Sequence, residues 1–456
     1  MVNFKLENIG LIDNAEVSLN DFTLICGQNN TGKTYITYSI YGFLHNWSSL
    51  IDFDLNDSIF RELNENGFCK IDITSFEKES KNILDRLSEK YTKSLDSIFS
   101  TDSEWFSNSS FQVEIENFKL NLGNELSNTF SSSKKDILQL KKVKDSTFLE
   151  ISILSSNIKS ELPQFILERS INESLGLIFF GEYLKKPFII TSERTGISLF
   201  HTELDINRNV MVEHLTNNKS KDINPFKLFE ENISRYAMPI RKNIDFSREL
   251  EDEINRNKSF LFEDKEIAKY FTEMLNGGMY KFIKNEGIVL VTKKTKTKES
   301  KKIPMYLTSS ASKSLLDLYA YITRFARKDE ILIIDEPELN LHPNNHIIMA
   351  RLLVYLLNNG IKVFITTHSD YLVKELNNLI RLNHKINEKA KTKIFKEYKY
   401  KEHDILDYKK ISAYINDLGE INQVEISNMG MKIETFDTTI NCLSNAMNEI
   451  YFNIED

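Results

Sequence analysis

Cysteine is scarce in this chain of 456 residues, and the three present, Cys26, Cys69 and Cys442, lie far apart. This spacing supplies neither a disulfide framework nor a metal-binding cysteine motif, and it suits a reducing compartment. Long apolar runs are also missing, because none approaches the ~18 residues that a membrane-spanning helix needs. Residues 1–7 lack the apolar core of a signal peptide. We therefore expect a soluble, cytoplasmic protein with no membrane partner.

Excess positive charge and sequence repeats are absent as well. The 58 Lys and Arg residues stand against 66 Asp and Glu, so a net charge of −8 gives no overall attraction to nucleic acid or to an anionic membrane. No internal repeat is visible, and no sustained heptads run through residues 46–180, which argues against a long coiled-coil arm. Apolar residues are plentiful, at 41% with 30 Phe, which predicts a globular protein of about three domain-sized units.

The stretch Gly27–Thr34 matches the phosphate-binding loop pattern G-x-x-x-x-G-K-[ST] at every fixed position. The apolar run Phe22–Cys26 before it predicts a buried strand, and apolar residues at helical spacing after it predict a helix from near Lys33. In such a loop, backbone N–H groups and the helix N-terminus hold phosphate oxygens, the lysine reaches the β- and γ-phosphates, and the Thr34 hydroxyl binds Mg²⁺. We therefore expect ATP and Mg²⁺ as cofactors. The candidate nucleotide-binding residues are Gly27, Asn29, Asn30, Thr31, Gly32, Lys33 and Thr34.

A second strong signal is the apolar strand Ile331–Ile334, which ends in two carboxylates. Four consecutive apolar residues predict a central parallel strand. Beside a bound nucleotide, Asp335 at the strand end is a candidate Mg²⁺ ligand together with Thr34, and Glu336 is the candidate general base that polarises the attacking water. A purely structural acidic turn is the alternative, and the phosphate loop elsewhere in the chain argues against it.

His368 follows the buried strand Val363–Ile365 and has hydroxyl residues around it. A single histidine is often structural. Here the strand–helix–strand spacing from Asp335 places His368 at the same sheet edge as Glu336, because the carboxyl ends of parallel strands meet there. We therefore favour a catalytic role for His368 as a sensor of the γ-phosphate.

Three further polar segments allow two readings each. The hydroxyl-rich stretch Leu307–Ser314 precedes a predicted helix, so Ser309, Ser310 and Ser312 suit either phosphate binding or N-capping. The cluster Ser192–Gly196 follows the buried strand Phe188–Thr191 and is either functional or an ordinary turn in which Glu and Arg pair with each other. A basic loop at Lys293–Lys302 contacts nucleic acid in one reading. The other reading is a solvated loop, which the lack of interleaved aromatic residues favours.

Taken in order, the phosphate loop, the serine-rich segment, the acidic strand end and the histidine resemble an ABC-type ATPase head of the SMC-like and OLD-like branch. The continuation Glu336-Pro337-Glu338 through Leu341-His342-Pro343 is typical of that branch and not of transporter subunits. Thr366-Thr367-His368-Ser369 resembles its switch-histidine motif. Ser192-Glu193-Arg194 resembles a segment common in stand-alone bacterial members, among them the ATPase subunits of anti-phage systems such as PARIS and Septu.

The resemblance implies that two heads meet head to tail, with each ATP between the phosphate loop of one copy and the signature segment of the other. Self-association is therefore expected, with Thr308, Ser309 and Ser310 acting across the interface. Two departures from the family pattern stand out. Ser309-Ser310-Ala311 replaces the usual Gly-Gly-Gln, which makes close backbone approach to the γ-phosphate harder. The glutamine that usually follows the first lobe has no clear counterpart, and Glu193 is the candidate to replace it.

The fold class implied is α/β, an ABC-type P-loop ATPase head with a mixed sheet. We expect five parts. They are a head lobe with the phosphate loop (1–45), an insertion of mixed helix and strand (46–180), a helical segment and hairpin that complete the head (181–300), a lobe with the signature, acidic strand and histidine (301–385), and a small α+β C-terminal extension (386–456).

Alternation in the outer parts predicts strands at Phe111–Ile115, Phe148–Ile151, Lys409–Ile415 and Met431–Thr435, and a helix over Ile440–Tyr451. The C-terminal part is too short for the TOPRIM domain that OLD-like nucleases carry after the ATPase. It also holds no compact acidic cluster. We therefore expect no nuclease domain in this chain and any nuclease activity in a separate partner.

The combined expectation is an ATPase that acts as sensor or scaffold for an effector, such as a TOPRIM or HNH nuclease, in bacterial anti-phage defence. A phage protein or nucleic acid would be the trigger. The alternative is an SMC-like ATPase that clamps or repairs DNA, which calls for a long coiled coil and a basic surface. A non-catalytic binding module predicts loss of Lys33 or Glu336, and both are present.

Overall fold

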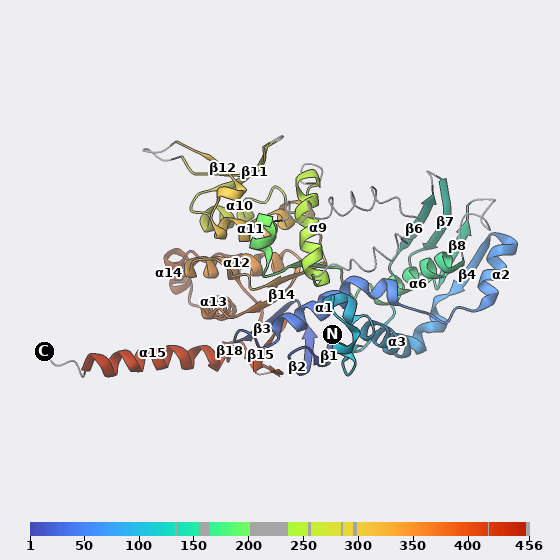
Figure 1. The fold of residues 1–456 in the computed structure, drawn as a ribbon, viewed down its shortest axis with the longest axis horizontal. Helices are drawn as coiled ribbons and strands as arrows, with labels where there is room; N and C mark the ends of the chain where they lie inside the picture. Colours follow the sequence, from blue (N-terminus) through green and yellow to red (C-terminus); the bar gives the residue numbers. More distant parts are fainter. Residues whose placement is uncertain are drawn as a thin grey trace, which may run out of the picture.

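The structure is a computed structural model (Figure 1), and it describes residues 1–132, 135–154, 164–200, 236–253, 257–283, 286–294, 299–417 and 419–452. Two parts of the sequence predictions lie outside these ranges, namely Lys296 and Lys298 of the basic loop and residues 201–235 of the expected helical segment. None of the helices in the described ranges combines the length and apolar character needed to span a bilayer.

A mixed sheet of nine strands forms the centre of the molecule (Figure 1). Its strands are β1 (Val2–Ile9), β2 (Ile12–Leu19), β3 (Phe22–Gly27), β5 (Ser110–Ile115), β9 (Pro187–Ile190), β13 (Ile331–Asp335), β14 (Lys362–Thr367), β15 (Ile411–Asp417) and β16 (Glu420–Gln423). Their spatial order is β5-β1-β2-β16-β15-β3-β14-β13-β9. The section from β15 to β9 is parallel, whereas β5, β1 and β2 pair antiparallel. The predicted α/β class with a mixed sheet is confirmed.

Helices cover both faces of this sheet, and each face has its own hydrophobic core. One face carries α1 (Lys33–Leu50), α3 (Ser80–Thr92) and α6 (Gln164–Phe180). The other carries α10 (Lys265–Met274), α11 (Ser310–Ala320), α12 (Pro343–Asn358) and α13 (Asp370–Arg381). Successive strand residues point to opposite faces, so Ile25 lies in the first core while Leu24 and Cys26 lie in the second. The continuous apolar runs predicted as buried strands therefore serve two cores at once.

Residues 57–180 build a second, antiparallel sheet at one end of the molecule (Figure 1). Its order is β4-β8-β7-β6, and the bounds are β4 (Phe68–Asp72), β6 (Leu126–Ser132), β7 (Lys135–Lys142) and β8 (Phe148–Ile153), with α2 (Asp57–Asn66) and the short α4 (Leu95–Phe99) nearby in sequence. The strand predicted at Phe148–Ile151 is confirmed as β8. The strand predicted at Phe111–Ile115 exists as β5, but it pairs with β1 in the main sheet.

The segment between the two halves of the head contributes α9 (Met238–Glu253) and a small antiparallel sheet of β10 (Met279–Ile283), β11 (Gly287–Val291) and β12 (Lys302–Pro304). The predicted hairpin is thus confirmed in β10 and β11, which pair antiparallel. After α13 come α14 (Glu388–Tyr398), β17 (Ile426–Ser427), β18 (Gly430–Met431) and α15 (Glu434–Phe452).

The C-terminal part differs from the expected extension in two ways. First, β15 and β16 are strands of the main sheet, and β15 lies directly beside β3. Both faces of β15 are buried, with Ala413 in one core and Tyr414 in the other, so packing draws it into the head. Second, the strand predicted at Met431–Thr435 is wrong beyond Met431, because α15 already begins at Glu434. The predicted C-terminal helix is confirmed and is longer than expected.

Candidate active site

The phosphate loop connects β3 to α1, as its sequence predicts. Gly32 is the N-cap of α1 with φ +100°, a region that side chains other than hydrogen rarely adopt. A Cβ on Gly27 would lie 2.6 Å from the backbone oxygen of Asn416 on β15. The loop therefore needs glycine at both ends, once for backbone conformation and once for the close approach of a neighbouring strand.

The side chain of Lys33 closes the phosphate loop from within. Lys33 is buried, and its ammonium group donates hydrogen bonds to the backbone oxygens of Gly27 at 3.0 Å and Gln28 at 2.6 Å. The Thr31 hydroxyl donates to the same Gln28 oxygen at 2.9 Å. Burial lowers the pKa of Lys33. The loop thus surrounds a positive charge, an arrangement that suits phosphate oxygens.

Asp335 ends β13, which lies two strands from β3 in the sheet order. The Thr34 hydroxyl donates to Asp335 Oδ2 at 3.2 Å, and the Thr366 hydroxyl donates to Asp335 Oδ1. Burial raises the pKa of Asp335 to about 6, and the nearby carboxylates Glu336 and Glu193 add to the shift. The Asp335 carboxylate and the Thr34 hydroxyl supply too few protein oxygens to surround a metal ion completely. This suits Mg²⁺, which usually takes its other ligands from water and substrate phosphates.

Glu336 and His368 meet at the same sheet edge. His368 Nδ1 lies 3.4 Å from Glu336 Oε1, and the parallel register of β13 and β14 brings the two chain segments together. The hydrogen bond between them raises the pKa of His368 and lowers that of Glu336. Glu336 adopts φ +52°, and its N–H donates to the Thr366 backbone oxygen at 3.2 Å. The turn is therefore fixed in a conformation that aims the carboxylate at the histidine.

Glu338 is a site residue to which the sequence reasoning gave no role. It is buried, and its Oε1 accepts hydrogen bonds from the Thr367 hydroxyl at 2.6 Å and from the His368 N–H at 2.9 Å. Glu338 thereby orients the backbone that carries His368, whose Nδ1 lies 3.5 Å away. The Glu-Pro-Glu sequence is the signal that could have identified it.

The cluster Ser192–Gly196 contacts the backbone that carries the two carboxylates Asp335 and Glu336. Arg194 is 2% exposed, and its guanidinium donates to the backbone oxygens of Asp335 at 2.9 Å and Glu336 at 2.6 Å, as well as to Thr191. Glu193 accepts a hydrogen bond from the Tyr38 hydroxyl at 3.1 Å. Among the ion pairs of the described residues, none joins Glu193 to Arg194, so the turn with a Glu–Arg pair is not formed. Arg194 instead fixes the backbone that presents the two carboxylates.

The serine-rich segment lies apart from these groups. Ser309 is the N-cap of α11, and its hydroxyl accepts from the Ser312 N–H at 3.2 Å. Ser309 and Ser310 are exposed, as are the preceding Tyr306 at 70% and Leu307 at 66%. No hydrogen bond or ion pair in the described ranges links this segment to the phosphate loop, the acidic strand end or His368. The structure thus unites the candidates Gly27–Thr34, Asp335, Glu336 and His368, but not the serines.

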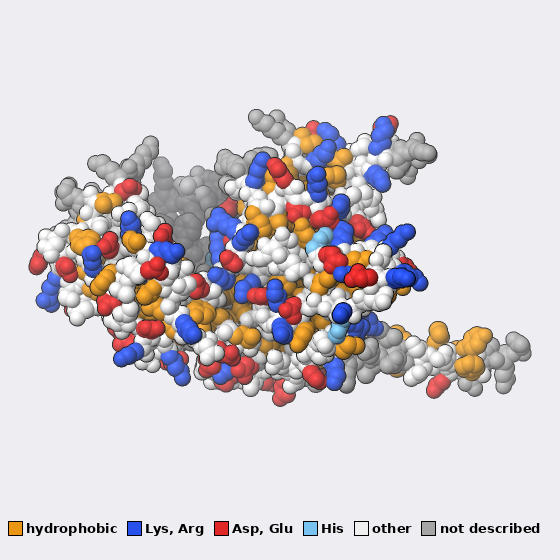
Figure 2. Space-filling model, turned by 180° about the vertical axis from the view of Figure 1, so that it is seen from behind, with side chains coloured by type: hydrophobic (Ala, Val, Ile, Leu, Met, Phe, Trp, Pro, Cys, Tyr) orange, Lys and Arg blue, Asp and Glu red, His pale blue; other side chains and the backbone are white. Residues whose placement is uncertain are grey.

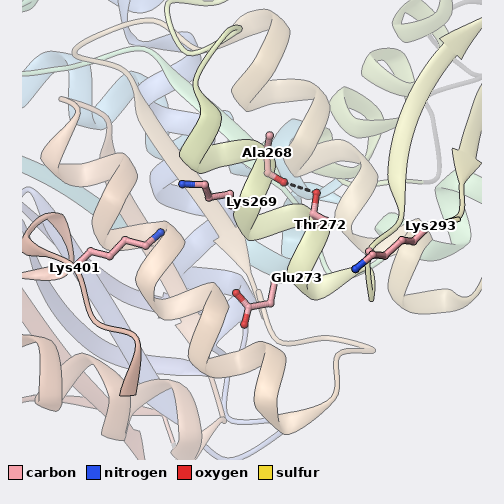
Figure 3. A pocket seen from close by; sticks show the side chains of 7 residues that line it. Ala268, Lys269, Thr272, Glu273, Lys293 and Lys401 are labelled. Carbon is pink, nitrogen blue, oxygen red and sulfur yellow. Dashed lines mark hydrogen bonds between the residues drawn. The ribbon is translucent and has the colours of Figure 1, made fainter. Parts of the chain in front are cut away.

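A cleft of about 500 Å³ lies elsewhere on the molecule, at α10 and β11 (Figure 3). Lys269, Glu273, Lys293 and Lys401 line it, and none of the predicted site residues does. Two of its lysines already have a partner, because Lys269 and Lys401 both bond to Glu266. This cleft is therefore separate from the candidate active site.

A mixed sheet with a phosphate loop after one strand and paired carboxylates at the end of another is an arrangement typical of nucleotide-binding ATPase domains. Residues 1–373 match the family model described as AAA ATPase domain (AAA_15), and the chain belongs to this nucleotide-binding family. The curated proteins include no match to the chain.

Three solved structures are among those similar to the chain. The first is the Smc head domain of Pyrococcus furiosus with an extended coiled coil, bound to the C-terminal domain of ScpA, at 12% identity and TM-score 0.32, covering 98% of this chain and 100% of that one. The second is a SmcHead bound to the C-winged helix domain of ScpA, at 10% identity and TM-score 0.35, covering 93% and 97%. The third is the SMC head domain of Thermotoga maritima, at 11% identity and TM-score 0.30, covering 93% and 98%.

Proposed function

We propose that the chain binds and hydrolyses Mg-ATP. Lys33 and the amides of the phosphate loop bind the phosphates, and Thr34 and Asp335 bind Mg²⁺. Glu336 is the general base and His368 the γ-phosphate sensor. The observation that carries the proposal is the meeting of the Thr34 hydroxyl, the buried Asp335 carboxylate and the Glu336–His368 pair at one edge of the sheet. Bound Mg²⁺ would neutralise charge on the phosphates, which is chemistry that the chain alone does not supply.

The same proposal includes assembly of two heads around ATP. Tyr306 and Leu307 expose large apolar side chains next to Ser309 and Ser310, and among the described residues no hydrogen bond ties this segment to the chain's own phosphate loop. A second copy would cover these groups and place its serine hydroxyls and the N-terminus of α11 against the γ-phosphate. ATP-dependent closure then becomes a two-state element, because each copy completes the other's site.

We further propose that this cycle makes the chain a sensor or scaffold for a separate effector, such as a TOPRIM or HNH nuclease, in bacterial anti-phage defence. Support comes from the resemblance of Ser192-Glu193-Arg194 to a segment of such ATPases. Among the described residues, no group of three or more His, Cys, Asp and Glu side chains is placed to bind a metal. In this proposal the nuclease is a second chain.

The test of the composite site is phosphate release from mixed variants. Wild type is expected to turn over, whereas Lys33→Ala, Glu336→Gln and Ser309→Asp are each expected to fail. Mixing Lys33→Ala with Ser309→Asp should restore part of the activity, because one heterodimer site then has an intact phosphate loop and an intact signature.

Mixing Lys33→Ala with Glu336→Gln is the matched control, since both changes damage the same chain's half of a site. This mixture should stay inactive. Recovery in both mixtures, or in neither while wild type is active, would contradict the head-to-tail arrangement.

DNA clamping is the second candidate function, and the basic loop is the feature that bears on it. In the described part of this loop, Lys294 pairs with Glu299 at 2.9 Å and Lys302 with Glu286 at 3.7 Å. These pairs reduce the positive charge available to phosphates. Salt-dependent binding of duplex DNA would favour this candidate.

A further inference from the structure

A basic pocket of about 330 Å³ lies at the sheet edge opposite the candidate active site. Its lining comes from residues 257–260 and 324–328, and the second stretch precedes the start of β13, whose other end carries Asp335. None of the residues that line it is acidic. Four of them are cationic, namely Lys258, Arg324, Arg327 and Lys328.

These four cations lack the carboxylate partners that basic residues have elsewhere in the chain. On the face drawn in Figure 2, acidic and basic side chains are interspersed. Within the described ranges, by contrast, no ion pair joins any of the four to a carboxylate. Asp329 and Glu330 follow the cluster without lining the pocket, and the Glu330 carboxylate accepts hydrogen bonds from the Arg327 N–H and the Tyr321 hydroxyl. The pocket therefore presents an excess of positive charge, which attracts a polyanion.

The two sides of the pocket are bonded to each other. After α11 the chain makes a single π-helical turn, Tyr321–Phe325, which closes with a hydrogen bond of 2.8 Å from the Ala326 N–H to the Tyr321 oxygen. Such turns are rare and occur frequently at functional sites. The Ser259 N–H donates to the Thr323 oxygen of this turn at 3.1 Å. The segment that carries Lys258 and Phe260 is thus held in place beside the turn that carries Arg324.

Arg324 brings a positive charge that no described carboxylate pairs with. Its guanidinium carbon lies 4.4 Å from the centroid of the Phe262 ring and 5.3 Å from that of Phe282. One of its terminal nitrogens donates to the Asn257 oxygen at 3.3 Å, but its buried Nε has no hydrogen-bond partner among the described residues. A buried donor without a partner is costly. The aromatic contacts hold the side chain without removing its charge, so an anion in the pocket would gain from it.

Phe260 adds an exposed aromatic ring beside these charges. It is 43% exposed, and Lys328 Nζ lies 5.8 Å from the centroid of its ring. Aromatic rings among Lys and Arg side chains bind single-stranded nucleic acid, because a base stacks on the ring while the cations contact the backbone phosphates. A duplex keeps its bases stacked inside the helix, and an acidic peptide has no base to stack. The ring therefore favours a single strand over either.

We propose that this pocket binds one nucleotide unit of a single-stranded nucleic acid. The base stacks on Phe260, and the phosphates on either side of it contact Lys258, Arg327 and Lys328. A volume of about 330 Å³ lies at the small end of the ~300–1,000 Å³ range of ligand pockets, which suits one nucleotide at a time. The site uses neither the phosphate loop nor bound ATP, so it goes beyond the proposed ATPase function.

The test is the fluorescence anisotropy of a labelled oligothymidylate mixed with the full-length chain in a Lys33→Ala background, without ATP. This background disables the phosphate loop, so the result does not depend on the proposed ATPase function. We expect salt-dependent binding of the single strand and weaker binding of a duplex of the same length. Phe260→Ala should weaken binding of the single strand at least about fivefold. Phe165→Ala removes another exposed ring, on α6, and is the matched control that should leave binding unchanged.

The salt dependence tests the cations. Arg327→Gln with Lys328→Gln removes two phosphate contacts, so the slope of log affinity against log salt concentration should become shallower by about 1.4, at about 0.7 per contact for a single strand. Lys294→Gln with Lys302→Gln removes the same charge from the basic loop and should leave the slope unchanged.

Three results would overturn the proposal. The first is no binding of the oligothymidylate by the Lys33→Ala chain, and the second is a duplex that binds as tightly as the single strand. The third is an equal effect of the two charge variants or of the two phenylalanine variants. Thymidine monophosphate or polyglutamate that competed as well as the oligothymidylate would identify a free nucleotide or an acidic peptide as the ligand, and would overturn the proposal as well.

Discussion

The two halves of the proposed nucleotide site differ in how completely one chain builds them. In the half formed by the phosphate loop and the acidic strand end, the proposed catalytic and metal-binding groups contact one another: the Thr34 hydroxyl donates to Asp335, and Glu336 pairs with His368. In the half formed by the signature segment, the serine hydroxyls bond only within their own turn, and Tyr306 beside them is exposed. The chemical half is thus preorganised in a single chain, whereas the recognition half faces outward.

The largest expected effect is on the preorganised half. Glu336→Gln keeps the size of the side chain but removes the carboxylate that would accept a proton, and general-base catalysis is typically worth ~10²–10⁴ in rate. We expect phosphate release to fall by about this factor while nucleotide binding is retained, as measured by single-turnover kinetics and equilibrium titration with ATP. Lys33→Ala is the control that should lose binding itself. Undiminished turnover in the Gln variant would show that Glu336 is not the base.

The second prediction concerns Arg194, whose guanidinium bonds to the backbone of Asp335 and Glu336. Arg194→Met removes the guanidinium donor from the backbone oxygens of Asp335 and Glu336, and hydrogen bonds to a charged group contribute about 1.5–3 kcal/mol each. We expect the free energy of unfolding to fall by about 3 kcal/mol or more in denaturant titrations.

Arg169→Met is the matched control for that substitution. Arg169 is 63% exposed and pairs with Glu173 on the surface of α6, so its loss should cost less than about 1 kcal/mol. Similar costs for the two variants would mean that Arg194 does not hold the acidic turn in place.

The third prediction separates two roles of Ser309 in the outward-facing half. Ser309→Asp preserves an N-cap for α11, because aspartate caps as well as serine, but it adds a negative charge where the γ-phosphate is expected. We expect unchanged stability and an ATPase rate reduced at least about tenfold, the kinetic equivalent of 1.36 kcal/mol. Ser309→Ala loses the cap and about 1 kcal/mol of stability. If Ser309→Asp were fully active, capping would be the only role of the segment.

The two halves of the site also differ in how well the sequence predicts their residues. Asp335 ends the buried parallel strand β13, Glu336 follows it, and His368 follows β14. Period and spacing alone bring residues at such strand ends to one sheet edge. The motif positions of the preorganised half were therefore predictable. The serines of the other half gave two readings, and the single chain displays only the capping interaction.

Other features depended on long-range packing that no local pattern encodes. The sequence places Arg194 in a cluster with two readings, but two of its three acceptors are backbone oxygens 141 and 142 residues away in sequence. The placement of β15 beside β3 was missed, because a short apolar strand looks the same in a C-terminal extension as in a central sheet. The role of Glu338 also depends on packing between segments distant in sequence, because its partners Thr367 and His368 lie 29 and 30 residues away.

The smallest expected effect concerns Asn416, a buried amide beside the phosphate loop. Asn416 on β15 lies opposite Gly27 and is 2% exposed, yet neither polar atom of its side chain has a hydrogen-bond partner in the described ranges. A buried amide without partners is costly, so the nearly isosteric Asn416→Leu should leave the free energy of unfolding unchanged or raise it by up to about 1 kcal/mol.

The matched control is Asn243→Leu, because that buried amide bonds to Ile189 and Thr191, and its loss should cost about 2 kcal/mol. Urea titrations compare the two. An equal loss for Asn416 would mean that its amide is hydrogen-bonded beneath the phosphate loop, for example to buried water.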